Sequence, residues 1–213
     1  HLPTLSDFRL QAIYAWSAYP PGTDTLTSMG GFITGHIVKE AEPQGPDRVR
    51  LTLWNGERRG FGSEPTLFSE TLVGGGNTAV VGWHVPYGRL FPGQLSQCWW
   101  TGLPQRWNAV EGGFWRILGW QLRSVFEAGS VSPFGQPVML QRCAWVYKQV
   151  LEHGKQAAVD PRIALALVHF PIPHMPSIYD SRSGRLDARL STPTGYFDNL
   201  RLVDCTLGIL REA

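Results

Sequence analysis

The chain has few lysines, few cysteines and no long apolar run, and each scarcity excludes a class of function. Lysine and arginine together make up 19 of the 213 residues, but lysine occurs only at Lys39, Lys148 and Lys155, and the net charge is +2. Proteins that bind nucleic acid normally carry a clustered basic footprint. Because no basic run occurs here, we do not expect nucleic acid to be a partner.

The three cysteines, Cys98, Cys143 and Cys205, are widely spaced. They form neither a Cys-x-x-Cys metal pattern nor the framework of a disulfide-rich domain. No stretch of 18 apolar residues is present, so we expect a soluble segment without a membrane span. The abrupt start at His1 favours an excised part of a longer protein, whose location the segment leaves open.

The composition predicts a folded chain with one core. Hydrophobic residues make up 43% of the sequence and charged residues only 17%, a balance typical of globular proteins. The length suits one sizeable core or an incomplete larger domain, and we predict a single, partial domain over residues 1–213.

Helical patterns alternate with apolar, strand-like runs along the chain. The pattern predicts a helix over 66–72 ended by three glycines, a strand over 77–83, a helix over 137–158, a fully buried strand over 163–170 and a final helix from 196. This alternation predicts the α/β class, with a mostly parallel sheet sandwiched by helices. In residues 1–20 the pattern predicts a helix followed by a short extended piece. In residues 40–64 it predicts a loop with one strand over 49–54.

Tryptophan is concentrated between residues 86 and 135. The stretch 114–122 could form an amphipathic helix whose aromatic side chains include Trp115 and Trp120. Such a stripe more often packs in a core or between domains. The functional alternatives are a sugar platform and a contact with a membrane surface.

A dense cluster of hydroxyl groups follows a Pro/Gly break over residues 20–35. The cluster includes Thr25, Thr27 and Ser28, and an apolar helical run then closes at Gly35. Hydroxyl groups at a helix start usually cap free backbone N–H groups. The same place also suits a phosphate or sulfate group, because those N–H groups and the helix dipole attract anions. On chemistry alone, capping is the more common role.

A His-rich turn stiffened by prolines follows the predicted strand over 163–170. It runs His169-Phe170-Pro171-Ile172-Pro173-His174-Met175-Pro176. Ligands of open α/β sheets gather at the carboxyl ends of the strands. Two imidazoles there could bind metal, donate to an oxyanion or protonate a leaving group, although a histidine taken alone is more often structural.

The hydroxyl-rich segment, Thr25-Leu26-Thr27-Ser28-Met29-Gly30-Gly31-Phe32-Ile33-Thr34-Gly35, resembles the nucleophile segment of the sulfatase and alkaline phosphatase superfamily. In that family a Cys, Ser or Thr precedes a helix that ends in a Leu-Leu-Thr-Gly-like signature. The resemblance makes Thr25 the metal-bound nucleophile and gives Ser28 a supporting role. Formylglycine sulfatases need a Cys-x-Pro-Ser-Arg pattern, from which Thr25, Thr27 and Met29 depart, and this favours the Thr-dependent phosphotransfer branch.

Two other segments resemble the same family toward the end of the chain. Residues 168–176 resemble a strand followed by Pro-His-x-Pro, which makes His174 a ligand of the substrate anion and gives His169 a supporting place at the strand end. Residues 195–208 resemble the helix that comes just before the family's strand with the Asp-His metal pair.

A fourth match, over residues 77–84, is weaker. It resembles a segment in which a Lys and a His hold the substrate anion. Here no Lys follows Gly82, and His84 comes one residue early. His84 is therefore a candidate anion ligand, and Arg89 is a candidate substitute cation on the basis of its charge.

The resemblance implies an alkaline phosphatase-like fold that is incomplete in this segment. The family's other metal ligands should lie before residue 1 and after residue 213, so this segment alone is expected to be inactive. The intact protein is expected to use a divalent metal (Zn, Mn, Mg or Ca) to hydrolyse or transfer phosphate or sulfate esters of a small molecule, glycan or lipid. By analogy with relatives that carry Thr, it could be the extracytoplasmic part of a membrane-anchored bacterial protein.

Two alternatives from other classes stay open. The first is a catalytically inactive domain that keeps the fold as a binding or structural module. The second is an aromatic-rich carbohydrate-binding module that depends on Trp115 and Trp120 rather than on Thr25 and His174.

Overall fold

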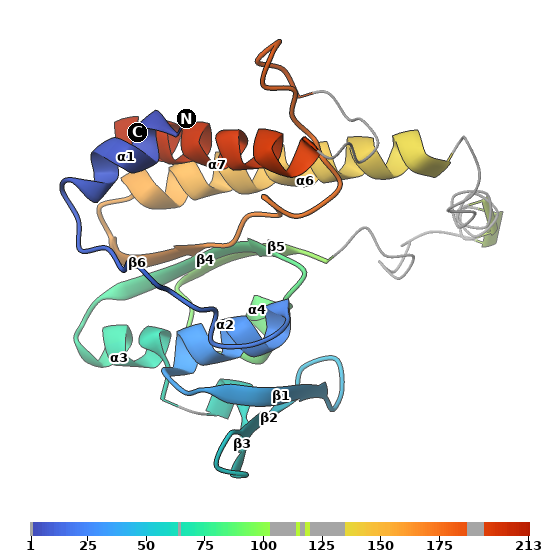
Figure 1. Ribbon diagram of the computed structural model, residues 1–213. Helices are drawn as coiled ribbons and strands as arrows, with labels where there is room; N and C mark the ends of the chain where they lie inside the picture. Colours follow the sequence, from blue (N-terminus) through green and yellow to red (C-terminus); the bar gives the residue numbers. More distant parts are fainter. Residues whose placement is uncertain (1, 64, 103–113, 116–117, 120–134, 187–193) are drawn as a thin grey trace. The chain divides into compact units, whose positions relative to one another are not determined.

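The computed structural model describes residues 2–63, 65–102, 114–115, 118–119, 135–186 and 194–213 (Figure 1). These residues divide into two compact units. We call residues 11–101 and 153–169 the sheet unit, and residues 1–10, 102–152 and 170–213 the helical unit.

A three-stranded parallel sheet forms one layer of the sheet unit. Strand β4 (Asn77–Trp83) lies between β5 (Gln97–Thr101) and β6 (Ile163–Val168), and both pairings are parallel. Helix α3 (Leu67–Val73) precedes β4 and contacts it, as Figure 1 shows. The predicted helix, glycine turn and strand are therefore confirmed, and so is the coarse assignment to the α/β class.

The outer strands differ from the prediction. We predicted a fully buried strand over 163–170, but β6 ends at Val168 and is an edge strand, with Ala164 and Ala166 exposed. An edge strand has only one neighbour, so an apolar run there does not guarantee burial. Strand β5, which carries Trp99 and Trp100, was not predicted.

A second, antiparallel sheet follows helix α2 (Thr25–Thr34). It consists of β1 (Val38–Pro43), β2 (Val49–Leu53) and β3 (Arg58–Gly60), in that order. We predicted only the middle strand. Strand β1 could not be predicted because of its charged side chains, and β3 could not because it is only three residues long. Strand β2 could be predicted because its residues alternate between buried and half-buried positions.

The core of the sheet unit lies between its two sheets and their short helices. Phe91 follows helix α4 (Tyr87–Leu90), and its ring meets Phe61 and Phe68 edge to face at centroid distances of 5.0 and 5.2 Å. All three rings are at most 1% exposed. Phe61 opens a 3-10 turn (Phe61–Ser63), so this cluster joins the antiparallel sheet to α3 and α4. Burial of each ring contributes about 2 kcal/mol.

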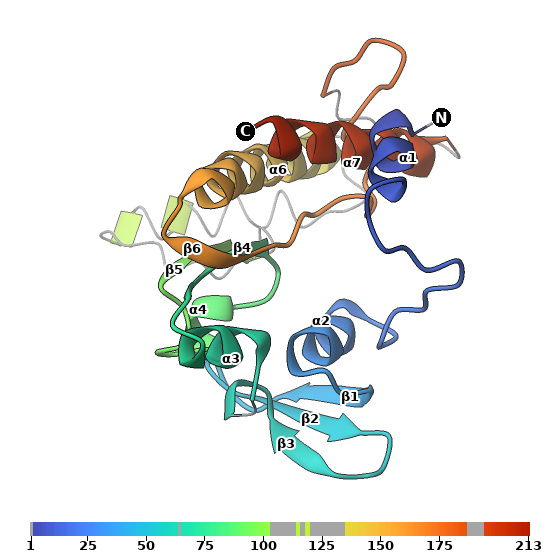
Figure 2. The same cartoon turned by 90° about the vertical axis from the view of Figure 1, so that its left-hand side faces the viewer.

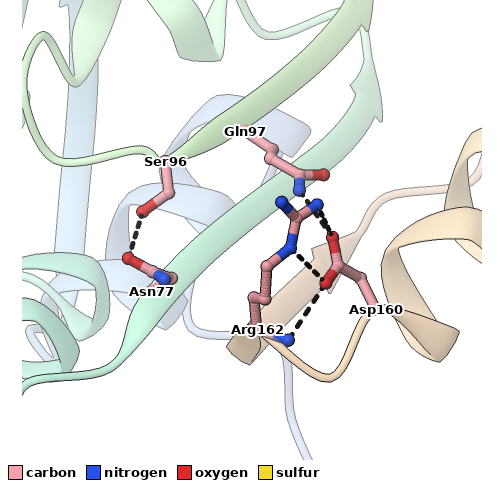
Figure 3. A network of polar contacts seen from close by, with 5 residues as sticks. All are labelled: Asn77, Ser96, Gln97, Asp160 and Arg162. Carbon is pink, nitrogen blue, oxygen red and sulfur yellow. Dashed lines mark hydrogen bonds and ion pairs between the residues drawn. The ribbon is translucent and has the colours of Figure 1, made fainter.

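A polar network holds the amino edge of the parallel sheet (Figure 3). The carboxylate of Asp160, just before β6, accepts hydrogen bonds from the backbone and guanidinium of Arg162 and from the side chain of Gln97 on β5. Ser96 donates to Asn77, the first residue of β4. These contacts join the starts of all three strands. Because the strands are parallel, the chain segments that follow them all begin at the opposite, carboxyl edge of the sheet.

The helical unit contains α1 (Pro3–Arg9) and α7 (Gly195–Glu212), which lie side by side (Figure 2). The carboxylate of Asp204 accepts from the backbone N–H groups of Leu5 at 2.7 Å and Thr4 at 3.2 Å. Asp204 thus caps the start of α1 from another helix, because Leu2 offers no side-chain cap.

Helix α6 (Gly135–Val159) begins in the helical unit and ends in the sheet unit. In the helical unit, the Tyr147 hydroxyl lies 2.8 Å from the hydroxyl of Thr206 on α7. The helices predicted over 137–158 and from 196 are confirmed, and the helix predicted at the start of residues 1–20 is α1. Of the predicted helix over 114–122, the structure describes only residues 114–115 and 118–119. Within the described residues, no helix is both long and apolar enough to cross a membrane.

Candidate functional site

Helix α2 begins with a carboxylate cap. Asp24 Oδ1 accepts from the N–H groups of Leu26 at 2.8 Å and Thr27 at 3.0 Å, and the Thr27 hydroxyl accepts from the Asp24 N–H at 3.1 Å. The hydroxyl cap that we predicted is therefore the minor half of a capping box. Because the carboxylate already occupies two of the N–H groups at this helix start, they are not open to a substrate anion.

Thr25 is the first residue of α2 and is half-buried. Among the described residues, no hydrogen bond involves its hydroxyl, in contrast to its neighbours. The hydroxyl of Ser28 donates to the Gly22 carbonyl at 3.0 Å, and that of Thr27 donates to the Asp24 carbonyl at 3.1 Å. Ser28 thus supports the turn that leads into Thr25, which is compatible with the supporting role predicted for it.

Two glycines allow this turn to lie directly on the helix. A Cβ atom on Gly22 would come within 2.4 Å of the Thr27 hydroxyl, and one on Gly31 within 2.7 Å of the Pro21 ring. Such approaches are too close for any other residue. The glycines therefore fix the position of the segment that precedes Thr25.

Two histidines lie at the carboxyl edge of the parallel sheet, each directly after the last residue of a strand. His84 follows β4, and its N–H donates to the carbonyl of Thr101, the last residue of β5, at 2.9 Å. His169 follows β6, and its N–H donates to the Val81 carbonyl of β4 at 2.8 Å. The rings of both histidines lie near the ring of Trp83, at centroid distances of 5.7 Å for His84 and 6.1 Å for His169. The structure thus gathers two predicted residues around Trp83.

His84 has a left-handed backbone, with φ of 67°. This conformation is uncommon outside glycine and costs on the order of 1 kcal/mol, so the surrounding contacts must impose it. The backbone therefore changes direction at His84, directly after β4, and the His84 side chain is exposed there. Such strain is concentrated at functional sites more than elsewhere.

Tyr87, which the sequence analysis missed, is the partner of His169. Its hydroxyl lies 2.8 Å from Nδ1 of His169, and its ring is fully buried. Burial raises the pKa of the Tyr87 phenol far above its ordinary value. The phenol therefore stays protonated, and its hydroxyl can donate to Nδ1 or accept from it; when it donates, a neutral His169 ring carries its proton on Nε2.

Arg89 lies on α4, where its side chain is exposed. Its guanidinium carbon is 5.6 Å from the centroid of the Trp100 ring on β5. This cation–π contact holds a positive charge over the end of the sheet without neutralising it. The role of Arg89 as a substitute cation stays a prediction.

His174 lies in the helical unit, whereas Thr25, Ser28, His84, Arg89 and His169 lie in the sheet unit. The His174 side chain is exposed. Its backbone carbonyl accepts at 2.8 Å from the side chain of Asn199, a fully buried residue of α7. Asn199 was also missed, because the turn that it contacts lies 21 to 26 positions away in the sequence.

The described residues do not supply a metal site. No group of three or more His, Cys, Asp or Glu side chains among them could hold a metal ion. The nearest carboxylate in sequence to Thr25 is that of Asp24, which is engaged in the helix cap.

The chain is thus a mixed α/β protein whose three-stranded parallel sheet carries two histidines and a tyrosine at its carboxyl edge. It matches no protein-family model, and neither a curated protein nor a solved structure is significantly similar to it.

Proposed function

We propose that the full-length protein hydrolyses or transfers phosphate or sulfate esters through a covalent intermediate on Thr25. The observation that carries the proposal is the position of Thr25. Its half-buried hydroxyl stands at the first position of α2, on a turn fixed by Gly22, Gly31 and Ser28. A hydroxyl whose backbone is held in this way loses little further freedom when it attacks a bound ester.

The proposed reaction has two steps. The Thr25 oxygen forms a bond to phosphorus or sulfur, the bond to the ester oxygen breaks, and the proton of the Thr25 hydroxyl passes to the leaving alcohol. The oxygen of water or of an acceptor alcohol then bonds to the phosphorus or sulfur, the bond to the Thr25 oxygen breaks, and the proton of the attacking group restores the Thr25 hydroxyl. His84 and Arg89 are the proposed ligands of the anionic oxygens, because imidazole N–H and guanidinium groups stabilise the charge that develops there.

His169 is proposed to support the site through Tyr87. With Nδ1 accepting from the phenol, the ring presents an N–H donor rather than a lone pair at Nε2. A donor suits an anionic oxygen, whereas a metal would require the lone pair. The Tyr87 contact therefore favours a role of His169 toward the anion.

The resemblance also implies a divalent metal at Thr25. The donor set among the described residues does not fit one, so we derive no step through a metal.

The test compares Thr25→Ala and Thr25→Ser with Thr23→Ala in the full-length protein. Thr23 is an exposed hydroxyl residue two positions earlier and serves as the matched control. Turnover of an aryl phosphate and an aryl sulfate is measured with and without added divalent metal. We expect Thr25→Ala to abolish turnover, Thr25→Ser to retain a part of it and Thr23→Ala to retain nearly all. Equal turnover in Thr25→Ala and the parent protein would refute the proposal that Thr25 is the nucleophile.

A binding function is the second candidate, and the exposure of Trp115 favours it. Trp115 is 80% exposed and the adjacent Phe114 68% exposed, with their rings 5.2 Å apart and edge to face. Exposed aromatic faces of this kind stack on sugars. Trp120 lies outside the described residues. Glycan binding that survives Thr25→Ala but not Trp115→Ala would support this candidate, either as a dedicated carbohydrate module or as an inactive domain that retains binding.

A further inference from the structure

The backbone of helix α4 is fixed on both sides of Arg89. Tyr87 is 0% exposed and Leu90 is 3% exposed, and both belong to the core cluster of the sheet unit. The N–H of Arg89 itself donates to the Pro86 carbonyl at 2.9 Å. The freedom that remains at this position is therefore that of a long, exposed side chain. Because ordering such a side chain costs entropy, a contact that already restricts it favours binding.

Trp100 on β5 provides that contact. The guanidinium carbon of Arg89 lies over the indole, 5.6 Å from the ring centroid. Gly88 allows α4 to approach the ring closely, since a Cβ atom on Gly88 would lie 3.3 Å from Nε1 of Trp100 and 3.6 Å from its Cδ1. The indole is half-buried and packs against the core cluster, so it is itself held in place. The cation–π attraction therefore acts between a fixed ring and a side chain on a fixed helix.

The contact leaves both the charge and the N–H groups of Arg89 available to a ligand. Among the residues that the structure describes, the Arg89 side chain forms neither an ion pair nor a hydrogen bond. A carboxylate partner would occupy the donors of the guanidinium and cancel its charge, whereas an indole attracts the cation through its π face alone. Two oxygens of a phosphate or sulfate group can therefore accept from the guanidinium at once.

The pair lies at the carboxyl edge of the parallel sheet. Helix α4 follows β4, and Trp100 is the last residue but one of β5. Tyr87, the partner of His169, belongs to the same short helix as Arg89. All these residues are part of the sheet unit. The cation is thus held at the sheet edge that also carries the two histidines.

We propose that Trp100 is a positioning residue for Arg89: its indole restricts the guanidinium so that it meets the oxygens of a phosphate or sulfate group. The anion-binding part of this proposal rests on the proposed function, in which Arg89 is a ligand of the anionic oxygens. The positioning part does not rest on it, because it concerns the Arg89 side chain alone.

The matched control lies on the same strand. Trp99 points to the other face of β5, because successive side chains of a strand alternate. Its ring stacks on that of His153 at a centroid distance of 4.5 Å, and it is half-buried as Trp100 is. Trp99→Leu therefore removes an indole from the same strand but keeps the ring beneath Arg89. A general loss of packing should affect both variants, whereas a loss of positioning should affect only the Trp100 variant.

The test of positioning is the NMR order parameter of the Arg89 Nε–H bond in the full-length protein, whose signal is assigned by its loss in Arg89→Lys. Trp100→Leu keeps an apolar side chain without the π face, and we expect the order parameter to fall toward that of an unrestrained arginine. Trp100→Phe, which restores an aromatic face, should recover most of it, and Trp99→Leu should leave it unchanged. An unchanged order parameter in Trp100→Leu, or an equal fall in Trp99→Leu, would overturn the proposal. If Trp100→Leu does not fold, Trp100→Met, which fills the space with a flexible apolar chain, takes its place.

The test of the anion role is a double-mutant cycle on the binding of inorganic phosphate and inorganic sulfate, measured by titration calorimetry. We expect Trp100→Leu to weaken binding about two- to fivefold in the parent protein, but to have almost no further effect in Arg89→Gln, because both changes remove one function. Trp99→Leu should have no effect in either background. Equal losses in both backgrounds, or binding of neither anion by the parent protein, would overturn the anion role. If the cycle holds but the parent protein turns over no aryl ester, the proposed nucleophile fails and the anion site at Arg89 and Trp100 stands.

Discussion

The hydroxyl of Tyr87 lies 2.8 Å from Nδ1 of His169, although the two residues are 82 positions apart. Tyr87 begins the short helix after β4, and His169 follows β6. Because the two strands are parallel neighbours, both segments leave the sheet at its carboxyl edge. The pair therefore joins the two exits from the sheet and sets the hydrogen-bonding state of His169.

Removal of the Tyr87 hydroxyl should destabilise the fold modestly. Tyr87→Phe keeps the buried ring but leaves Nδ1 of His169 without this donor, which should lower the free energy of unfolding by about 1 kcal/mol. Urea unfolding monitored by tryptophan fluorescence measures the change. Tyr19→Phe is the control, since Tyr19 is 87% exposed, and it should have no effect. An unchanged free energy of unfolding in Tyr87→Phe would mean that the contact between Tyr87 and His169 makes no net contribution to stability.

Gly82 allows the Tyr87 ring to pack on β4. A Cβ atom at position 82 would lie 2.6 Å from Cε2 of Tyr87 and 3.4 Å from Cβ of His169. Gly82→Ala should therefore displace the ring and lower the free energy of unfolding by about 1–3 kcal/mol. Gly102→Ala, where no atom of the described residues lies within 4 Å of the added atom, is the matched control. Equal thermal midpoints for the two variants would contradict the packing argument.

The cap of α2 should depend on the carboxylate of Asp24. Asp24→Ala leaves the N–H groups of Leu26 and Thr27 without their acceptor and should cost about 1 kcal/mol of stability. Asp24→Asn retains an acceptor and should recover most of that loss. Chemical unfolding of both variants provides the comparison, and a loss of equal size in Asp24→Asn would show that the negative charge, rather than the cap geometry, is decisive.

The amino edge of the sheet should respond to acid through Asp160. Hydrogen bonds from the Arg162 side chain, its backbone N–H and Gln97 hold the pKa of Asp160 well below its ordinary value of 3.8. A lowered pKa in the folded state means that the carboxylate stabilises the fold above the ordinary pKa and loses this effect as the pH falls below it. Asp160→Asn should therefore destabilise the protein at neutral pH and differ less from the parent protein at about pH 3.

Urea unfolding at both pH values measures this difference. Asp47→Asn serves as the control, because Asp47 is 61% exposed and its ion pair with Arg48 spans 3.7 Å, so it should contribute little at either pH. A difference between Asp160→Asn and the parent protein that persists undiminished in acid would show that the effect is not due to the charge.

The sequence predicts the elements whose signals are local. Three consecutive glycines after Val73 end a helix, and the apolar run from Ala79 to Val81 forms the central strand, buried on both faces. The strands that the sequence analysis missed depend on partners instead. Residues 38–43 contain Lys39, Glu40 and Glu42, a charged composition that suits an edge strand as well as a loop, and the pairing of this segment with β2 decides between the two.

The candidate site divides in the same way. Thr25, His84 and His169 could be proposed from the sequence because histidines and clustered hydroxyl groups are residue types that often bind anions or react. Tyr87 and Asn199 could not, since their importance comes from contacts over 82 positions in one case and 21 to 26 in the other. The residues next to a tyrosine or an asparagine in the sequence do not show which distant group its side chain will hydrogen-bond to after folding.

The central claim is that Thr25 becomes covalently modified during turnover, and direct detection of the adduct tests it most sharply. The full-length protein is mixed with an aryl phosphate or aryl sulfate, quenched in acid during steady-state turnover and digested for peptide mass spectrometry. The account predicts one phosphoryl or sulfuryl group on Thr25 and none in Thr25→Ala. Turnover with an unmodified Thr25, an adduct at another residue or the absence of turnover would contradict it.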